Sequence, residues 1–474
     1  MTRLAIRAAM LLGAAMLALS ACTMGPDYAR PEAPAPAAWK ELPPHKAATP
    51  ADDVPRGAWW EAFHDPVLND LEAEVAAANQ TLRAAEANYR AARAAVGAAR
   101  AGLFPSLGAS AGATRARTSG GSANSGGSRA AYSASLDAQW ELDLWGRIRR
   151  LVEAAQDTAQ ASAADVQNTR LSLQSELAID YLQLRVADAA RRVLEDTVAA
   201  YERSLVLTQN RYSAGVAARV DVVQGETQLL AARASLIDIE ATRAQLEHAI
   251  AALVGKAPAD LSIAVVDSVP AVPDIPAGVP SELLERRPDI AAAERRVAAA
   301  NAQVGAATAA IFPTLTLSAS GGFLGSNLGN WLSLPNRVWS LGAAFAGPLF
   351  DAGLRESQRQ EAIAAYDATV ADYRGAVLDA FRDVEDNLAL LRVLDEESRV
   401  QAEALRAARE SVNLTLNQYR AGLVAFLNVV TVQAVAFNAE RTALELSGRR
   451  LVAAVNLVKA LGGGTGAAPV QPSS

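Results

Sequence analysis

Two long stretches without proline constrain the fold of this chain more than any other feature. Of the 21 prolines, none lies between residues 106 and 257 or between residues 349 and 468. Proline in a helix interior removes a backbone hydrogen bond and clashes with the preceding turn. Glycine is also absent between Gly146 and Gly215, and a continuous helix there would extend on the order of 100 Å. We therefore predict helices far longer than a compact domain needs.

The second half of the chain repeats the first. The tripeptide Leu103-Phe104-Pro105 recurs as Ile311-Phe312-Pro313 at an offset of 208 residues. The hexapeptide that starts at Arg211 and contains Ala214-Gly215-Val216 recurs as the one that contains Ala421-Gly422-Leu423, at an offset of 207. Because the offset survives across so much chain, we interpret it as a tandem duplication.

Each copy is predicted to contain helices, two strands and two further helical stretches. Residues 1–21 are predicted to be a signal peptide, 22–58 a lipidated extended arm, 256–281 a linker and 463–474 a flexible tail. Repeat 1 covers 59–255, with strands at about 103–145 and helices at about 59–102 and 146–255. Repeat 2 covers 282–462, with strands at about 311–350 and helices at about 282–310 and 351–462.

Strict alternation of polar and apolar residues predicts the strands. Residues 132–142 and 313–323 alternate in this way, and residues 106–117 and 338–348 are their expected partners. About ten residues per strand suits a tilted transmembrane strand. Four tryptophans near the strand ends would form an interfacial girdle: Trp140, Trp145, Trp331 and Trp339. The polar positions predicted to face a lumen are Ser133, Ser135, Asp137, Gln139, Glu141, Thr314, Thr316 and Ser318.

Four strands cannot close a barrel within one chain, and an open strand edge in lipid leaves backbone groups unpaired. A transmembrane sheet of this kind therefore requires several copies of the chain. The alternation alone also fits a soluble four-stranded sheet packed on helices, because it shows only that one face is buried. Acidic side chains at Asp137 and Glu141 would give a shared lumen a preference for cations.

A heptad pattern runs along the predicted long helices, which indicates that neighbouring helices supercoil. Its members in the first copy are Leu177, Tyr181, Leu184, Leu194, Val198, Tyr201, Leu205, Thr208 and Tyr212. Its members in the second copy are Val384, Leu388, Leu391, Leu405, Ala408, Val412, Thr415 and Tyr419. A hollow helical cylinder would use such seams; a solid coiled-coil rod is the alternative, but it leaves the strands unexplained. Each helix is expected to reverse at Gly215 or Gly422, where glycine can adopt a left-handed cap. The tips are expected to expose Val216, Leu423, Val424 and Phe426, which would invite a partner.

The N-terminus has the pattern of a secretory signal. Arg3 and Arg7 precede an apolar stretch that ends in Leu19-Ser20-Ala21-Cys22, and the last four residues resemble a bacterial lipobox. We expect the thiol of Cys22 to carry covalent lipid, including palmitate, and this would explain why the only cysteine lies there. An ordinary signal peptide with an incidental cysteine is the alternative.

Charge and residue counts exclude several classes of protein. The formal net charge of −7 argues against a nucleic-acid partner. One cysteine and three widely separated histidines leave no disulfide within the chain and no metal-ligand spacing. No phosphate-binding glycine loop and no His-Glu-x-x-His motif occurs. We expect no enzyme activity, no metal site and no cofactor other than the lipid.

These features together resemble one family, the outer membrane factors of tripartite efflux pumps, of the TolC and OprM type in the NodT-like lipoprotein branch. Four motifs carry the resemblance: the segment from Cys22 to Tyr28 with Arg30-Pro31, the pair Trp59-Trp60, the segment from Leu284 to Ile290, and the duplicated glycine turns. The resemblance implies a homotrimer in the outer membrane, with twelve strands in one barrel and long helices in a periplasmic α-barrel. It also implies a passive duct fed by a periplasmic adaptor, or membrane fusion protein, and an RND-type inner-membrane transporter.

The resemblance also assigns roles to single residues. It implies that adaptor hairpins dock on Gly215, Val216, Gly422 and Leu423, and that Asp221 narrows the periplasmic aperture by accepting bonds from donors such as Tyr419. Asn428 and Val424 stand where well-known members carry an acid and an arginine, so Arg219 and Arg420 are candidate substitutes. Asp221 could instead be an ordinary acid at a helix start, and Pro288 would begin a helix structurally.

Efflux of drugs or other small molecules, with a role in multidrug resistance, is the function that the resemblance implies. Related ducts also serve metal-ion efflux and type I protein secretion, and the sequence does not separate these cargoes. From another class, a structural lipoprotein that spans the periplasm as a rod remains an alternative.

Overall fold

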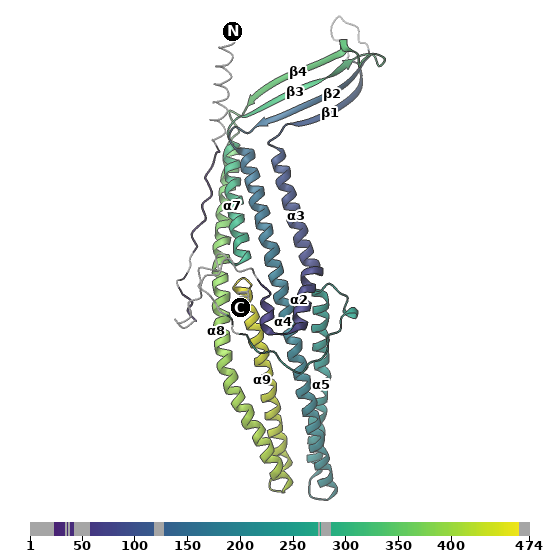
Figure 1. Cartoon of the computed structure of the whole chain (residues 1–474), viewed down its shortest axis with the longest axis vertical. Helices are drawn as coiled ribbons and strands as arrows, with labels where there is room; N and C mark the ends of the chain where they lie inside the picture. The colour runs from purple at the N-terminus through teal and green to yellow at the C-terminus, as the bar shows by residue number, and fades with distance from the viewer. Residues whose placement is uncertain are drawn as a thin grey trace, which may run out of the picture. The chain divides into compact units, whose positions relative to one another are not determined.

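The computed structural model describes residues 23–33, 36, 38–41, 57–117, 128–273, 275 and 286–463. The predicted signal peptide, the predicted lipid-attachment residue Cys22 and the C-terminal tail lie outside these residues. The described elements are, in chain order, η1 Trp59–Phe63, α2 Pro66–Ala78, α3 Gln80–Ala101, β1 Ser106–Arg117, β2 Ser128–Leu142, α4 Arg147–Ser213, α5 Arg219–Leu253, η2 Pro258–Asp260, α7 Pro288–Ala309, β3 Thr314–Gly325, η3 Leu334–Asn336, β4 Arg337–Ala346, α8 Leu354–Arg420 and α9 Phe426–Ala460 (Figure 1).

The chain divides into two compact units. The first contains Met1–Glu32, Ala87–Ala163 and Ala292–Arg374, and the second contains Ala33–Glu86, Ala164–Ala291 and Gly375–Ser474. Helices α4 and α8, of 67 residues each, contribute to both units. Among the described residues, no helix is both long and apolar enough to cross a membrane.

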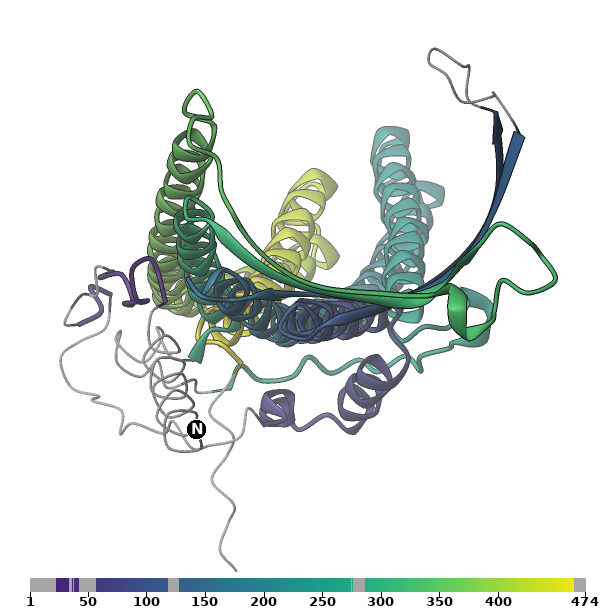
Figure 2. The ribbon, with the colours of Figure 1, turned by 90° about the horizontal axis from the view of Figure 1, so that it is seen from above.

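The first unit is built around a four-stranded antiparallel sheet with the order β1-β2-β3-β4. Figure 2 shows that this sheet is strongly curved. Its strands coincide with those predicted from the alternation, including the partner strands β1 and β4. Because β1 pairs only with β2 and β4 only with β3, both outer edges of the sheet lack a partner strand in the described chain.

The N-terminal arm of the first unit is held against α4 and α7. Arg150, whose side chain is 5% exposed, donates from Nε to the Met24 carbonyl at 3.2 Å. Its Nη2 atom forms an ion pair with Asp27 at 3.1 Å. A Cβ atom on Gly25 would lie 2.4 Å from the Cα atom of Gly305, so this close approach of two backbones requires glycine. The arm that follows Cys22 therefore packs against α4 and α7 from its first described residues.

The second unit consists mainly of helix pairs whose seams match the predicted heptads. Leu177, Tyr181 and Leu184 are at most 1% exposed, and Tyr201 and Leu205 pack with Val222 and Leu229 of α5. In the second copy, Leu394 of α8 packs with Leu446 of α9. One heptad member differs: Tyr212 is 44% exposed, whereas its counterpart Tyr419 is 3% exposed.

The helical region predicted for 59–102 is interrupted in the structure. Asp65 caps α2 by accepting from the amide of Val67 at 3.0 Å, next to Pro66 at the first helical position. Asn79 then separates α2 from α3, and its side-chain oxygen accepts from the amide of Leu82 at 3.0 Å. Side chains that cap helices therefore divide this region into shorter pieces.

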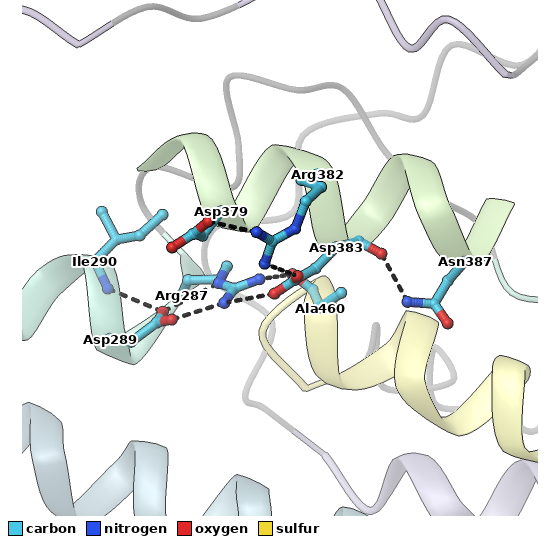
Figure 3. Close-up of polar contacts among 8 residues, drawn as sticks. All are labelled: Arg287, Asp289, Ile290, Asp379, Arg382, Asp383, Asn387 and Ala460. Carbon is cyan, nitrogen blue, oxygen red and sulfur yellow. Dashed lines mark hydrogen bonds and ion pairs between the residues drawn. The ribbon is translucent and has the colours of Figure 1, made fainter. Parts of the chain in front are cut away.

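Helix α7 begins at Pro288, as predicted, and the arginine before it links the ends of two helices. Pro288 begins α7, and Arg287 donates from Nη1 to the Ala460 carbonyl at the end of α9, at 3.1 Å. Its Nη2 atom lies 2.7 Å from Asp289 and 3.6 Å from Asp383 of α8 (Figure 3). A cation is favourable at a helix C-terminus, so Arg287 ties the ends of two helices to the side of a third.

Candidate functional site

The strand register brings the predicted lumen residues onto one face of the sheet. Gln139 is paired with Ser318 and Glu141 with Thr316, and directly paired residues share a face. Alternation then adds the remaining members to this face: Ser133, Ser135, Asp137 and Thr314. Serine, threonine and glycine of β1 join them, because Ser110 is paired with Ser135 and Gly112 with Ser133. We call this surface the polar face.

The two acids of the polar face have different partners. Asp137 accepts from the hydroxyl of Ser135 at 2.7 Å, and its partners among the described residues are hydroxyl groups. Glu141 instead forms a salt bridge with Arg147. The Nη2 atom of Arg147 donates to both carboxylate oxygens of Glu141, each at 2.9 Å. Gly146, with φ of 79°, turns the chain so that Arg147 returns to the sheet. The negative charge of Glu141 is therefore largely compensated, whereas that of Asp137 is not.

The opposite face of the sheet is apolar and exposed. Its residues include Leu136 at 56%, Trp339 at 70%, Leu341 at 76% and Phe345 at 63% exposure. Soluble monomers rarely expose an apolar patch of this extent. We call this surface the apolar face. A sheet with one polar and one apolar face, both uncovered, has the pattern of a wall between water and lipid.

Two tryptophans of the predicted girdle bond to main-chain carbonyls where the strands meet the helices. Trp140 donates from Nε1 to the Leu103 carbonyl at 3.0 Å, and Trp145 donates to the Pro313 carbonyl at 2.7 Å. The ring of Trp145 also stacks on Phe312 at 4.9 Å between centroids. An apolar ring with one satisfied polar atom suits a membrane interface.

The two helix tips of the second unit have the same backbone design. In the first, the amide of Gly215 donates to Tyr212 and that of Val216 donates to Arg211, both at 2.9 Å. The second repeats this pattern at Gly422 and Leu423 with distances of 3.0 and 2.9 Å. These bonds form a Schellman motif, which needs a left-handed residue, and both glycines have φ of 76°. Val216 and Leu423, at 64% and 75% exposure, project beyond the turns as predicted.

The two tips are joined within one chain by a cluster around Tyr419. The guanidinium of Arg211 lies 4.7 Å from the Tyr419 ring centroid, and its Nη1 atom donates to the Tyr419 carbonyl at 3.1 Å. The hydroxyl of Tyr419 lies 3.3 Å from that of the buried Thr208. The Tyr419 ring also packs on the Phe426 ring, with 5.5 Å between their centroids. We call these four residues the tip clamp.

The tip clamp corrects part of the predicted aperture. Tyr419 was expected to donate to Asp221, but its hydroxyl contacts Thr208, and it is only 3% exposed. The Asp221 carboxylate instead accepts from the Ala218 amide at 3.2 Å, as an acid in the first turn of a helix commonly does. Within the described chain, the arginine over the tyrosine ring is Arg211, rather than Arg219 or Arg420.

Two further expectations about the tips differ from the structure. Phe426 was predicted to be exposed, but it is 1% exposed; it packs with Tyr419 and Val429, and its ring lies beside Gly225 of α5. Asn428, the counterpart of Asp221, is exposed at the start of α9, and its side chain makes no cap. The two tips therefore share a backbone but differ in their side chains.

Sequence reasoning missed Arg211, Thr208 and Arg147 as functional candidates. Arg211 had a detectable signal, because the duplicated turn carries Gln418 at the matching position. Because the two turns are otherwise similar, a difference at this one position indicates that Arg211 makes a contact that Gln418 does not. Among the described residues, no cluster of histidine, cysteine or acids could hold a metal ion.

Comparison with known proteins places this geometry in context. The family described as "Outer membrane efflux protein" matches residues 72–256 and again 279–463. The chain is 33% identical over 464 residues, 96% of each chain, to the probable efflux pump outer membrane protein TtgC of Pseudomonas putida. It is 34% identical over 460 residues, 95% of each chain, to the pyoverdine export outer membrane protein OpmQ of Pseudomonas aeruginosa.

Solved structures give the same result. The outer-membrane channel OprN superposes with a TM-score of 0.85 at 33% identity, over 94% of this chain and 99% of that chain. The channel-forming protein CusC superposes with a TM-score of 0.83 at 26% identity, over 94% and 100%. The predicted fold class is confirmed, with long helices of an α-barrel and four strands per chain contributing to a trimeric β-barrel.

The predicted function and location are also confirmed: the chain is an outer-membrane channel for efflux. Relatives along its whole length are transport components, and both copies of the repeat match one family. This chain belongs to the outer membrane efflux protein family.

Proposed function

We propose that three copies of the chain form the exit duct of a tripartite efflux pump and conduct small molecules passively out of the cell. The sheet carries this proposal, because it exposes a polar face, an apolar face and two unpaired edges. Pairing β4 of one copy with β1 of the next satisfies both edges, and three copies of four strands give twelve. The polar faces then line the lumen, and the apolar faces contact lipid.

The duct does no chemistry of its own in this proposal. A periplasmic adaptor docks on the exposed Val216 and Leu423 of the two tips, and an inner-membrane RND-type transporter supplies the energy. The tip clamp holds the periplasmic end narrow until the adaptor binds. Asp221 and Asn428 stand at the starts of α5 and α9, and their side chains line this end.

The lipid anchor is part of the same proposal. Cys22 is acylated, and the arm that follows it is seated on Arg150 and Gly305. One acyl chain gives marginal membrane binding and several give stable anchoring. Acylation would hold each copy at the outer membrane before the three sheets close.

The cargo is proposed to be small organic molecules. The names of full-length relatives refer to toluene, antibiotics and pyoverdine. The preference for such cargo over metal ions and secreted proteins rests on these names rather than on the polar face. Asp137 is the acid of this face that lacks a basic partner among the described residues, and it would favour cations or neutral compounds in the lumen.

The oligomer and its conductance test the proposal. The protein is extracted in mild detergent, its mass is measured by native mass spectrometry, and it is then inserted into planar bilayers. We expect a mass three times that of one chain and discrete ion conductance, with larger conductance after the tips are opened. A stable monomer without conductance would contradict the duct and would favour the periplasmic rod.

A further inference from the structure

The loop that joins β3 to β4 has an unusual distribution of polar and apolar groups. Residues 326–336 contain no charged side chain. Leu328 is 64% exposed, Leu332 59% and Leu334 78%. Surface loops are normally polar because water surrounds them. We call residues 326–336 the leucine loop.

The polar groups of the leucine loop bond to one another. The side-chain amide of Asn336 donates to the Asn330 carbonyl at 2.9 Å and to the Ser333 hydroxyl at 3.2 Å. The amide of Gly329 donates to the side-chain oxygen of Asn327 at 3.0 Å. Main-chain bonds from Ser333 to Asn330 and from Asn336 to Ser333 complete the network. These bonds pair polar groups of Asn327, Asn330, Ser333 and Asn336 with one another, and the three leucine side chains are exposed.

The leucine loop packs on the apolar side of the sheet. Gly325 is paired with Tyr132, and both belong to the apolar face by alternation. A Cβ atom on Gly325 would lie 2.8 Å from the Cβ atom of Trp331, so Trp331 covers this glycine from the apolar side. The rings of Tyr132 and Trp331 also contact each other, with 6.4 Å between centroids. In Figure 2, the short helix η3 of the loop lies on the convex side of the curved sheet.

We propose that the leucine side chains of this loop insert among the acyl chains of the outer leaflet, where they extend the lipid-facing surface beyond the ends of β3 and β4. The occupant is lipid because the loop is continuous with the apolar face and carries no charge. Tryptophan and tyrosine at its base match the composition of a membrane interface. This inference rests on the proposed function, in which the apolar face contacts lipid.

Spin labelling of single cysteines in vesicles tests the proposal. A nitroxide is attached at Leu332→Cys and, in a second variant, at Leu334→Cys; both side chains are exposed, so their replacement removes little packing. Collisions of the nitroxide with oxygen, which concentrates in acyl chains, are compared with collisions with a nickel chelate, which stays in water. The unsubstituted protein gives any background from Cys22. Leu341→Cys on the apolar face and Ser135→Cys on the polar face are the controls.

The proposal predicts that the oxygen-to-nickel ratio at Leu332 and Leu334 is close to the ratio at Leu341 and well above that at Ser135. A low ratio in the loop with a high ratio at Leu341 would overturn this inference and leave the transmembrane sheet intact. Low ratios at the loop and at Leu341 would contradict the proposed function itself. A loop label that neither reagent reaches would show that a neighbouring copy covers the loop, which also overturns the inference.

Discussion

Replacing Arg211 with glutamine tests whether the tip clamp keeps the duct closed. The substitution gives the first tip the residue that the second tip carries at Gln418. It removes the hydrogen bond to the Tyr419 carbonyl and the cation–π contact with the Tyr419 ring. It preserves Thr208, Phe426 and the backbone of both turns.

The size of the effect follows from the two contacts. A hydrogen bond from a charged donor contributes about 1.5 to 3 kcal/mol, and a cation–π contact contributes about 0.5 to 2 kcal/mol. Because Arg211 is half-buried, we take about 2 to 3 kcal/mol for the pair. If both contacts are lost on opening, the ratio of open to closed tips should rise roughly 30- to 150-fold in the variant.

Resting conductance in planar bilayers measures this ratio without any partner protein. Arg219→Gln is the matched control, because it removes the same charge from an exposed position near the same tip. Thermal unfolding followed by circular dichroism checks that both variants remain folded. Equal resting conductance in Arg211→Gln and the unsubstituted protein would refute the clamp, and so would an equal increase in the Arg219 control.

Three further perturbations probe other parts of the chain. Glu72 is fully buried with neither carboxylate oxygen bonded within the described residues, and burial raises its pKa from 4.5 to about 9. The unfolded chain loses this proton at lower pH than the folded chain, so stability should fall as pH rises from about 4.5 to about 9, by about 3 kcal/mol at pH 7. Glu72→Gln should flatten that decline in the melting temperature, and an unchanged decline would contradict the assignment. Asp137→Asn should lower the cation-to-anion permeability ratio, whereas joint neutralisation of Glu141 and Arg147 should leave this ratio nearly unchanged. A larger change in the double variant than in Asp137→Asn would show that the salt bridge does not compensate Glu141. Gly215→Ala forces a side chain into a left-handed cap and should cost about 1 to 2 kcal/mol at that tip, which hydrogen exchange of the turn amides reports; unaltered exchange would disprove the strain.

The regular parts of the fold could be predicted because one local pattern decides them. The heptad positions Leu177, Tyr181 and Leu184 are buried along α4 as expected. Alternation along β2 and β3 gives the two faces of the sheet, since a strand has only two sides. Proline-free stretches and the repeated glycine turns located the long helices and their ends.

The details of the tips could not be predicted, because they depend on contacts between distant residues. Tyr212 and Tyr419 occupy matching positions of the repeat, yet only Tyr419 is buried. The Tyr419 ring is contacted by both Arg211 and Phe426. Phe426 is itself buried in a cluster with Tyr419 and Val429, and its ring lies beside Gly225 of another helix.

The salt bridge that compensates the charge of Glu141 could not be predicted for a similar reason. The sequence placed this acid on the polar face, but a periodic pattern ends where the strand ends. Gly146 reverses the chain just beyond the strand, and that turn brings Arg147 back to the carboxylate. A charge count along the strand alone therefore overstates the negative charge of this surface.

The difference between the two tips has a consequence for symmetry. A ring of three chains presents six similar turns of two alternating kinds. One kind has Arg211 in the last turn of the helix before it and Asp221 in the first turn of the helix after it. The other kind has Gln418 and Asn428 at these positions. Six identical ligand subunits arranged around that ring would meet two unlike environments in alternation. Such a ligand should bind with two affinities, three subunits each, so the duplication that doubled the binding positions also made them unequal.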